Sequence, residues 1–258
     1  MRTRYEAWLN KESLSAIDPS IMILDIAYGE PRFTQVLSDK PGRPGQHLTN
    51  RLLRSAQVTI SMEIHEQRIE KRQNVCELVN RWAAKGGLLT TNDKRGKQLR
   101  VICESPPVIA SALKWTQPVR LVFSAYEQPF WEDEYPVMEV LTGANAGASV
   151  YVPGIGAQTR AEVSVRNTSG DVLDALTVNA GGTTFDFEEL GLADGETLEI
   201  NHDENGLLRI RVGDVSKMAC RTAESDDELL LTTGMWENVE VLAGGEVVAT
   251  FKARGLYL

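Results

Sequence analysis

The sequence predicts a mainly β protein of two domains, and three observations support this fold class. Residues 66–85 have the hydrophobic period of a helix, whereas almost every other periodic segment has the two-residue period of a strand. Net charge changes sign along the chain: residues 1–130 hold 19 Lys and Arg against 13 Asp and Glu, a net of +6, and residues 131–258 hold 8 against 23, a net of −15. A length of 258 residues suits two hydrophobic cores. We therefore expect an N-terminal α+β sandwich over residues 1–133 and a C-terminal all-β sandwich over residues 134–258.

The N-terminal domain is expected to open with a short segment at residues 5–10 and a buried strand at residues 21–26. Residues 39–45 include two prolines and two glycines, too many for a regular element, and predict an exposed loop. Residues 56–64 then alternate strictly between hydrophobic and polar side chains, which is typical of a half-buried strand. The buried face of this strand is expected to carry Val58, Ile60, Met62 and Ile64.

The amphipathic helix over residues 66–85 interrupts the strands. Its hydrophobic side is expected to face a sheet and consists of Ile69, Val75, Cys76, Val79, Trp82 and Ala83. Trp82 and Val79 are expected to pack there together. The helix is expected to end at Gly86 and Gly87, because glycine adopts the left-handed conformation after a last helical turn without steric penalty.

A β-hairpin is predicted after the helix, with strands at residues 88–90 and 98–103 around a turn at residues 92–96. Its tip is polar and basic and is formed by Asn92, Asp93, Lys94, Arg95 and Lys97. We expect this tip to reach a neighbouring subunit and cover an exposed strand edge, as an oligomerisation hairpin. A further strand is expected at residues 119–126, after the break at Pro106 and Pro107.

Beyond Pro136 the periodic segments are short and all have the period of a strand. The ten expected strands cover residues 138–142, 149–152, 161–166, 175–178, 183–187, 197–200, 207–212, 228–231, 238–242 and 247–251. Turn residues at 203–206 and 243–246 predict a hairpin at each place. Ten short strands without a helix predict a β-sandwich or jelly roll.

The sequence offers no pattern typical of catalysis, of a cofactor site or of a metal site. His47, His65 and His202 lie far apart, and residues 202–206 lack the ligand spacing of a calcium loop. Gly-x-Ser-x-Gly and phosphate-loop patterns are absent. We therefore expect a protein that is not an enzyme, with no catalytic, cofactor-binding or metal-binding residue.

Cysteine content and hydropathy bear on where the protein is made. Three cysteines at wide spacing predict neither a disulfide framework nor a zinc motif, so we expect reduced side chains and assembly in a cytoplasm. No window reaches the roughly 20 apolar residues of a membrane span. No apolar signal-peptide core follows residues 1–5, so we expect neither membrane insertion nor general secretion.

Several segments occur in an order that carries a family resemblance: the strand at residues 58–64, Val79-Asn80-Arg81-Trp82 in the helix, residues 86–91 after it, the earlier loop at residues 41–45 and residues 125–132. Together they resemble the distal tail protein (Dit) of long-tailed, siphovirus-type phages and prophages of Gram-positive bacteria. Residues 192–200 and 229–234 are similar to the galectin-like C-terminal sandwich of that family.

The resemblance implies a structural protein of the virion, at the distal end of the phage tail. It implies a homo-hexameric ring that joins the tail tube protein to the baseplate hub protein and to receptor-binding proteins. DNA would pass through the ring without sequence-specific contacts. The net charge of −15 over residues 131–258 predicts in addition that the sandwich domains repel each other, splay outward and offer a docking platform.

Two alternatives remain open at the level of sequence. In the first, the protein is lectin-like and binds cell-wall saccharide through its C-terminal sandwich, with Tyr151 and Trp236 as stacking platforms. In the second, it is a polysaccharide hydrolase, which needs two carboxylates facing one cleft, an arrangement that sequence spacing does not reveal.

Overall fold

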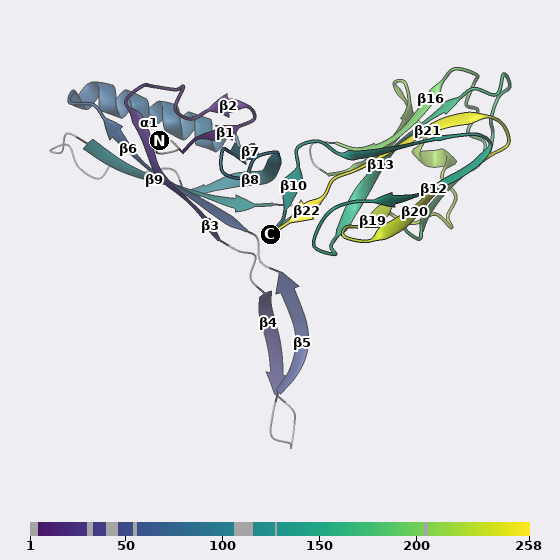
Figure 1. The fold of residues 1–258 in the computed structure, drawn as a ribbon, viewed down its shortest axis with the longest axis horizontal. Helices are drawn as coiled ribbons and strands as arrows, with labels where there is room; N and C mark the ends of the chain where they lie inside the picture. Colours follow the sequence, from purple (N-terminus) through teal and green to yellow (C-terminus); the bar gives the residue numbers. More distant parts are fainter. Residues whose placement is uncertain are drawn as a thin grey trace. The chain divides into compact units, whose positions relative to one another are not determined.

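The computed structural model describes residues 5–29, 33–39, 46–53, 56–105, 116–126, 128–203 and 206–258. Figure 1 shows a mainly β chain with a single α-helix among these residues, which confirms the predicted fold class. Contacts divide the chain into two compact units. Unit 1 comprises Met1–Glu132 with Leu258, and unit 2 comprises Asp133–Tyr257.

Unit 1 is built on one antiparallel sheet. Its strands follow the order β2 (Glu12–Ser13), β1 (Ala7–Leu9), β7 (Gly87–Thr91), β8 (Lys97–Ser105), β9 (Thr116–Ala125), β6 (Gln57–His65) and β3 (Ile21–Gly29), and β10 (Trp131–Asp133) also pairs with β8. The four hydrophobic side chains predicted for the inner face of β6 are all buried, as the alternation predicts. Among the described strands, β3 pairs with β6 alone and therefore forms an edge of the sheet.

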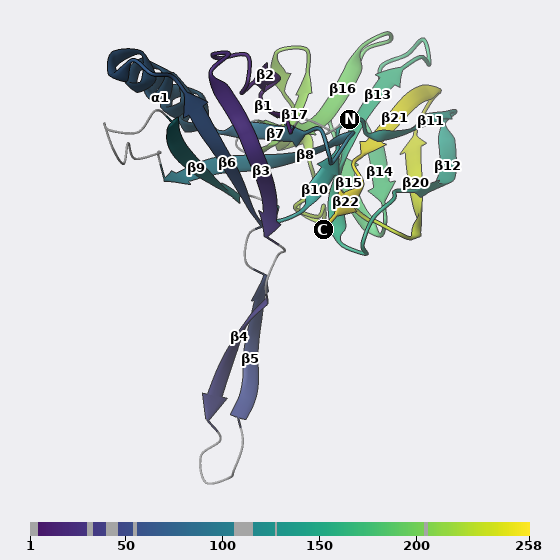
Figure 2. The same ribbon diagram turned by 60° about the vertical axis from the view of Figure 1, so that its left-hand side comes forward.

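Helix α1 (Ile69–Ala84) lies across one face of this sheet (Figures 1 and 2). Trp82 is buried beside Phe123 of β9, with ring centroids 6.1 Å apart and planes nearly perpendicular. The Trp82 indole Nε1 donates a hydrogen bond of 3.0 Å to the Glu12 carbonyl. Packing of Trp82 against the sheet is thus confirmed. No helix in the described ranges is long and apolar enough to cross a membrane.

The helix ends where the sequence predicts, at two glycines in the left-handed half of φ space. Gly86 has φ +59° and Gly87 has φ +112°. A Cβ atom at Gly87 would lie 2.2 Å from Asn10 Oδ1, so a side chain would strike the Asn10 amide as well as strain the backbone. Asn10 Oδ1 instead accepts the Leu88 N–H at 2.9 Å, and this contact fixes the start of β7.

The prediction for Ile69 is wrong, because its side chain is 46% exposed and not part of the apolar face of α1. Arg72, one turn later, is buried instead. Its Nη1 donates a hydrogen bond of 3.3 Å to the Glu66 carbonyl at the start of the helix. A long side chain with an apolar stem can thus take a place that hydrophobic periodicity assigns to an aliphatic residue.

A second hairpin, β4 (Phe33–Asp39) and β5 (Gln46–Leu53), stands between β3 and β6 in the sequence and forms a two-stranded sheet of its own (Figure 2). The loop predicted at residues 39–45 is wrong at its first residue, because Asp39 pairs with Gln46. The rest of that loop, and the break at Pro106 and Pro107, lie outside the described residues.

Unit 2 is a sandwich of two sheets. The larger sheet has the order β11 (Val137–Thr142), β21 (Val247–Ala253), β13 (Gln158–Asn167), β16 (Thr197–His202), β17 (Leu208–Val212) and β18 (Val215–Ser216), with β19 (Leu230–Thr232) also on β13. The smaller sheet has the order β12 (Asn145–Tyr151), β20 (Trp236–Ala243), β14 (Leu176–Ala180) and β15 (Thr183–Phe187). All ten predicted strands are present. The short strands β18 and β22 (Leu256–Tyr257) and one 3-10 turn, η1 (Met218–Cys220), were not predicted.

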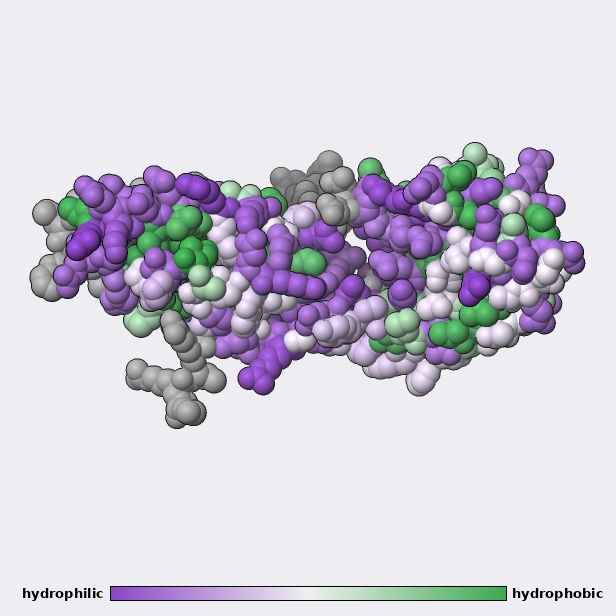
Figure 3. All heavy atoms as spheres, turned by 90° about the horizontal axis from the view of Figure 1, so that it is seen from above, coloured by the Kyte–Doolittle hydropathy of each residue, from purple (hydrophilic) through white to green (hydrophobic). Residues whose placement is uncertain are grey.

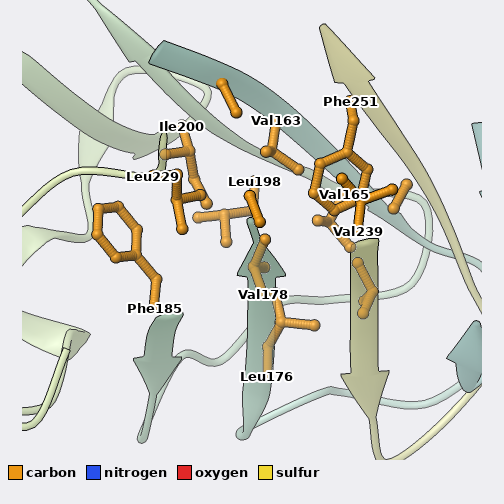
Figure 4. Close-up of a cluster of buried hydrophobic side chains, with 14 of the residues drawn as sticks. Val163, Val165, Leu176, Val178, Phe185, Leu198, Ile200, Leu229, Val239 and Phe251 are labelled. Carbon is orange, nitrogen blue, oxygen red and sulfur yellow. The ribbon is translucent and has the colours of Figure 1, made fainter. Parts of the chain in front are cut away.

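The core of unit 2 lies between the two sheets. Figure 4 shows Phe185 and Val178 of the smaller sheet pointing toward Ile200, Val165 and Phe251 of the larger one. These side chains are all buried. Two inner faces that interdigitate in this way confirm the predicted all-β sandwich.

One of the two predicted hairpins of unit 2 is wrong. Residues 243–246 join β20 to β21, but β20 pairs with β12 and β14, whereas β21 pairs with β11 and β13. The turn therefore carries the chain from one sheet to the other, a step that turn composition does not distinguish from a hairpin. The other prediction is confirmed, since β16 and β17 pair in register from Leu198 to His202. Glu204 and Asn205 at its tip lie outside the described residues.

Candidate functional site

Among the described residues, no group of three or more His, Cys, Asp or Glu side chains is placed to hold a metal ion. Burial lowers the pKa of His202, and its Nε2 atom is enclosed without a hydrogen-bond partner in the part of the chain that the structure describes. The His202 side chain as a whole is half-buried in unit 2. His65 forms an ion pair of 3.3 Å with Glu63 when protonated, and the side chain of His47 lies outside the described residues.

The predicted oligomerisation hairpin is the β7–β8 turn, and its tip contacts its own chain. Asn92 Oδ1 accepts the Glu6 N–H at 3.0 Å. The hydroxyl of Tyr28, on β3, donates to Asp93 Oδ1. The Arg95 side chain is exposed, and its Nε donates to the Asn92 carbonyl at 3.4 Å.

Lys94 lies at the centre of these contacts. Its Nζ donates a hydrogen bond of 2.9 Å to the Leu258 carbonyl. The same atom lies 5.1 Å from the ring centroid of Tyr28 and 5.1 Å from that of Trp131. The two rings meet edge to face, with centroids 5.6 Å apart. We call Tyr28, Lys94, Trp131 and Leu258 the lysine cluster.

Electrostatics of the lysine cluster follow from its partial burial. Burial lowers the pKa of Lys94, and the charge of Asp93 opposes that shift. Burial, together with the hydrogen bond to Asp93, raises the pKa of Tyr28 well above its ordinary value. The phenol therefore stays protonated at neutral pH, and Lys94 Nζ lies within cation–π distance of both rings.

The lysine cluster brings together positions that no local spacing links. Sequence periodicity marks none of the residues at 28, 131 and 258 as partners of the hairpin tip. Asn92, Asp93, Lys94 and Arg95 contact their own unit, and contact of this tip with a neighbouring subunit stays a prediction.

A second feature of unit 1 suits contact with other chains. Strand β3 has nine residues, and Met22 and Leu24 on it are exposed, at 40% and 43%. Strands at the edge of a sheet present unpaired N–H and C=O groups to any chain that approaches. From the sequence this segment was expected only as a buried strand, because its hydrophobic run gives no sign of which side lacks a partner.

Tyr151 and Trp236, the two predicted stacking residues, are brought together by the structure. They are directly opposite on β12 and β20, and their ring centroids are 5.6 Å apart. Both are exposed, Tyr151 by 42% and Trp236 by 71%. The next pair along the same face is Ser149 and Asn238, joined by a hydrogen bond of 2.8 Å from Ser149 Oγ to Asn238 Oδ1. Figure 3 shows, on the face seen from above, hydrophobic patches on a mostly hydrophilic surface.

Comparison with known proteins places this fold. No family model and no curated protein sequence matches the chain. Among solved structures, the Dit protein of phage SPP1, a hub of the adsorption apparatus in phages that infect Gram-positive bacteria, matches with a TM-score of 0.73 at 10% identity. The match covers 98% of this chain and 99% of that one.

Two structures of the phage p2 baseplate in its activated conformation also match. The calcium form has a TM-score of 0.55 at 9% identity over 99% of this chain and 98% of the other. The strontium form has a TM-score of 0.53 at 10% identity over 97% of each chain. The resemblance expected from the sequence is confirmed at the level of the fold: along nearly its whole length, this chain has the fold of the Dit hub protein of a phage that infects Gram-positive bacteria.

Proposed function

We propose that this protein is a structural component of a phage tail tip, a Dit-like hub that forms a homo-hexameric ring. Residues 1–133 would form the ring and residues 134–258 the peripheral sandwich. The observation that carries the proposal is the end-to-end fold match to the SPP1 Dit protein, which spans both units of this chain. A fold shared by one domain alone would support far less, because single sandwiches serve many unrelated functions.

Features of unit 1 support a role in assembly. Strand β3 pairs with β6 alone among the described strands, and β4 and β5 pair only with each other among them, so these strands have edges whose backbone groups a neighbouring subunit can cover. A cyclic ring needs two different, complementary surfaces on each subunit, because each copy binds one neighbour with the first surface and the other neighbour with the second. We propose the edge of β3 and the β7–β8 turn as elements of these surfaces.

The proposed partners are those that the resemblance to Dit implies. The ring would join the tail tube protein on one side to the baseplate hub protein on the other, and DNA would cross its channel. The net charge of −15 over residues 131–258 disfavours close packing of six sandwiches within the ~8 Å Debye length of physiological salt. The sandwiches would therefore point outward and receive receptor-binding proteins, with avidity from six copies. The protein would reside in the virion, at the distal end of the tail.

Size-exclusion chromatography with light scattering tests the ring. A hexamer has a mass of about 171 kDa, six times the 28.5 kDa of one chain. A mass of about 28.5 kDa at every concentration tried would refute self-assembly. Electron microscopy of the assembled fraction then tests the arrangement, because acidic sandwiches packed at the centre of the ring would contradict their proposed outward position.

A further inference from the structure

We propose that the outward face of the smaller sheet of unit 2 binds a neutral polysaccharide, with Trp236 and Tyr151 as its stacking platform. Asn238 and Glu240 would supply its hydrogen bonds. This binding goes beyond the hub function and does not depend on ring formation, since all four residues belong to one sheet of one chain.

The aromatic pair provides a platform that the sandwich itself does not need. Trp236 and Tyr151 point away from the core, and their contact fixes the tilt of both rings at 46° to each other. Trp236 leaves 71% of its surface in water, which is a cost for so large an apolar side chain. The flat apolar face of a pyranose ring can cover an exposed indole, while the hydroxyls at its rim stay hydrated or bonded.

Polar side chains continue the same face directly beyond the aromatic pair. The Asn238 carbonyl oxygen already accepts the Ser149 hydroxyl, and Glu240 Oε2 accepts Asn179 Nδ2 at 3.0 Å. Asn179 Oδ1 in turn accepts the hydroxyl of Thr184 at 2.7 Å. Within the described part of the chain, the Asn238 Nδ2 hydrogens and Glu240 Oε1 have no partner, so one donor group and one acceptor point are left for a ligand.

These bonds hold the polar groups in place before any ligand arrives. An amide and a carboxylate whose orientation is already fixed lose little conformational entropy on binding. The Asn238 Nδ2 group can donate to one sugar hydroxyl, and Glu240 Oε1 can accept from another. The distance between the stacking and the hydrogen-bonding residues suits a short oligosaccharide. Trp236 and Glu240 are four residues apart on β20, roughly 14 Å along a strand. A di- or trisaccharide can therefore stack at one end and hydrogen-bond at the other.

Charge selects the chemical class of the ligand. The outward positions of β12, β14, β15 and β20 include two carboxylates, Glu240 and Asp186, and no Lys or Arg. Residues 131–258 as a whole carry a net charge of −15. An anionic polymer such as a teichoic acid would meet repulsion and no cation on this face. A neutral cell-wall glycan meets neither obstacle.

The test uses the full chain on a glycan array that carries neutral bacterial oligosaccharides, with teichoic acid fragments as the anionic arm. The strongest neutral oligosaccharide is then titrated by calorimetry against the parent protein and four variants. Trp236→Ala should weaken binding by about 30-fold or more, and Glu240→Gln and Asn238→Ala by about 10-fold each. Tyr135→Ala is the matched control, since Tyr135 is an exposed aromatic residue of unit 2 outside this face, and it should leave the affinity unchanged.

Three results would overturn the proposal: no neutral oligosaccharide retained on the array, retention of the anionic fragments alone, or unchanged affinity in Trp236→Ala. Loss of binding to another tail protein in Trp236→Ala, without any glycan binding in the parent, would identify a protein-docking surface instead. Melting temperatures equal to that of the parent protein establish that the variants are folded. The hexamer mass, measured on the same samples, reports on the hub function separately.

Discussion

Replacing Lys94 with Met tests whether the lysine cluster stabilises unit 1. The substitution keeps most of the apolar stem and removes the ammonium, which bonds the Leu258 carbonyl and faces the rings of Tyr28 and Trp131. A hydrogen bond from a charged donor contributes about 1.5 kcal/mol or more, and each cation–π contact at a half-buried site about 0.5–1 kcal/mol. Desolvation of the ammonium offsets part of this sum.

The net loss expected for Lys94→Met is therefore about 1–2 kcal/mol in the free energy of unfolding, less than the separate contributions add up to. For a unit of this size, that loss corresponds to a fall in melting temperature of roughly 3–8 °C. Differential scanning calorimetry of the full chain measures it. Arg95→Met is the control, because Arg95 lies on the same turn but is exposed, and it should shift the melting temperature by less than about 2 °C.

An unchanged melting temperature in Lys94→Met would refute the stabilising role of the lysine cluster. A fall of equal size in Arg95→Met would also refute it, since the turn would then be sensitive to any loss of charge.

Further predictions concern the helix, the half-buried His202 and the hairpin tip. Trp82→Ala should cost about 3–5 kcal/mol in unit 1, because it empties the space beside Phe123, and an unchanged denaturation midpoint would contradict this. The folded pKa of His202 lies below its unfolded value of 6.5, so the unfolded state takes up the proton first. The contribution of His202 to the free energy of unfolding should therefore be complete above pH 6.5 and be lost as pH falls through the folded pKa. His202→Gln should flatten that loss in thermal melts recorded across this pH range. Deleting residues 92–97 should shift the hexamer toward monomer in light scattering. Arg95→Glu should also shift the proposed hexamer toward monomer without disturbing Lys94. Normal assembly of both variants would show that the hairpin tip does not hold neighbouring subunits together.

Alternation predicted the strands of unit 2 well, because each has one buried face and one face in water. In β13, for example, Val163 and Val165 are buried while Glu162 and Arg166 are exposed, so the sequence carries the strand period directly. The amphipathic helix was equally clear, apart from the exposed Ile69 and the buried Arg72, whose hydrogen bond to the Glu66 carbonyl no hydropathy pattern records.

The hairpin β4–β5 escaped prediction for a local reason. Its register shifts between Val36 and Leu37, where two hydrophobic residues stand side by side in the sequence. A bulge of this kind breaks the two-residue period on which strand prediction rests. The absence of strict alternation therefore hid a paired strand in a segment read in part as loop.

The sequence could not predict which residues meet at the candidate sites, because these residues lie far apart in the chain. The pairing of Tyr151 with Trp236 requires β12 and β20 to be neighbours, although 84 residues separate the two side chains. The lysine cluster joins four distant positions in the same manner. Residue types suggested which side chains could stack or carry charge, but only the strand order decides which of these side chains come into contact.

The order of strands in the larger sheet of unit 2 has a consequence for synthesis. Strand β21 lies between β11 and β13, yet it is translated after every other strand of that sheet. Until residues 247–253 leave the ribosome, β11 has no partner in the sheet and β13 keeps an open edge. Pairing over such a sequence separation is slow, because loop closure costs entropy before the contact forms. Most of unit 1 can acquire its structure while the sandwich is still incomplete. The lysine cluster forms only with the last residue of the chain, because Lys94 donates its hydrogen bond to the Leu258 carbonyl.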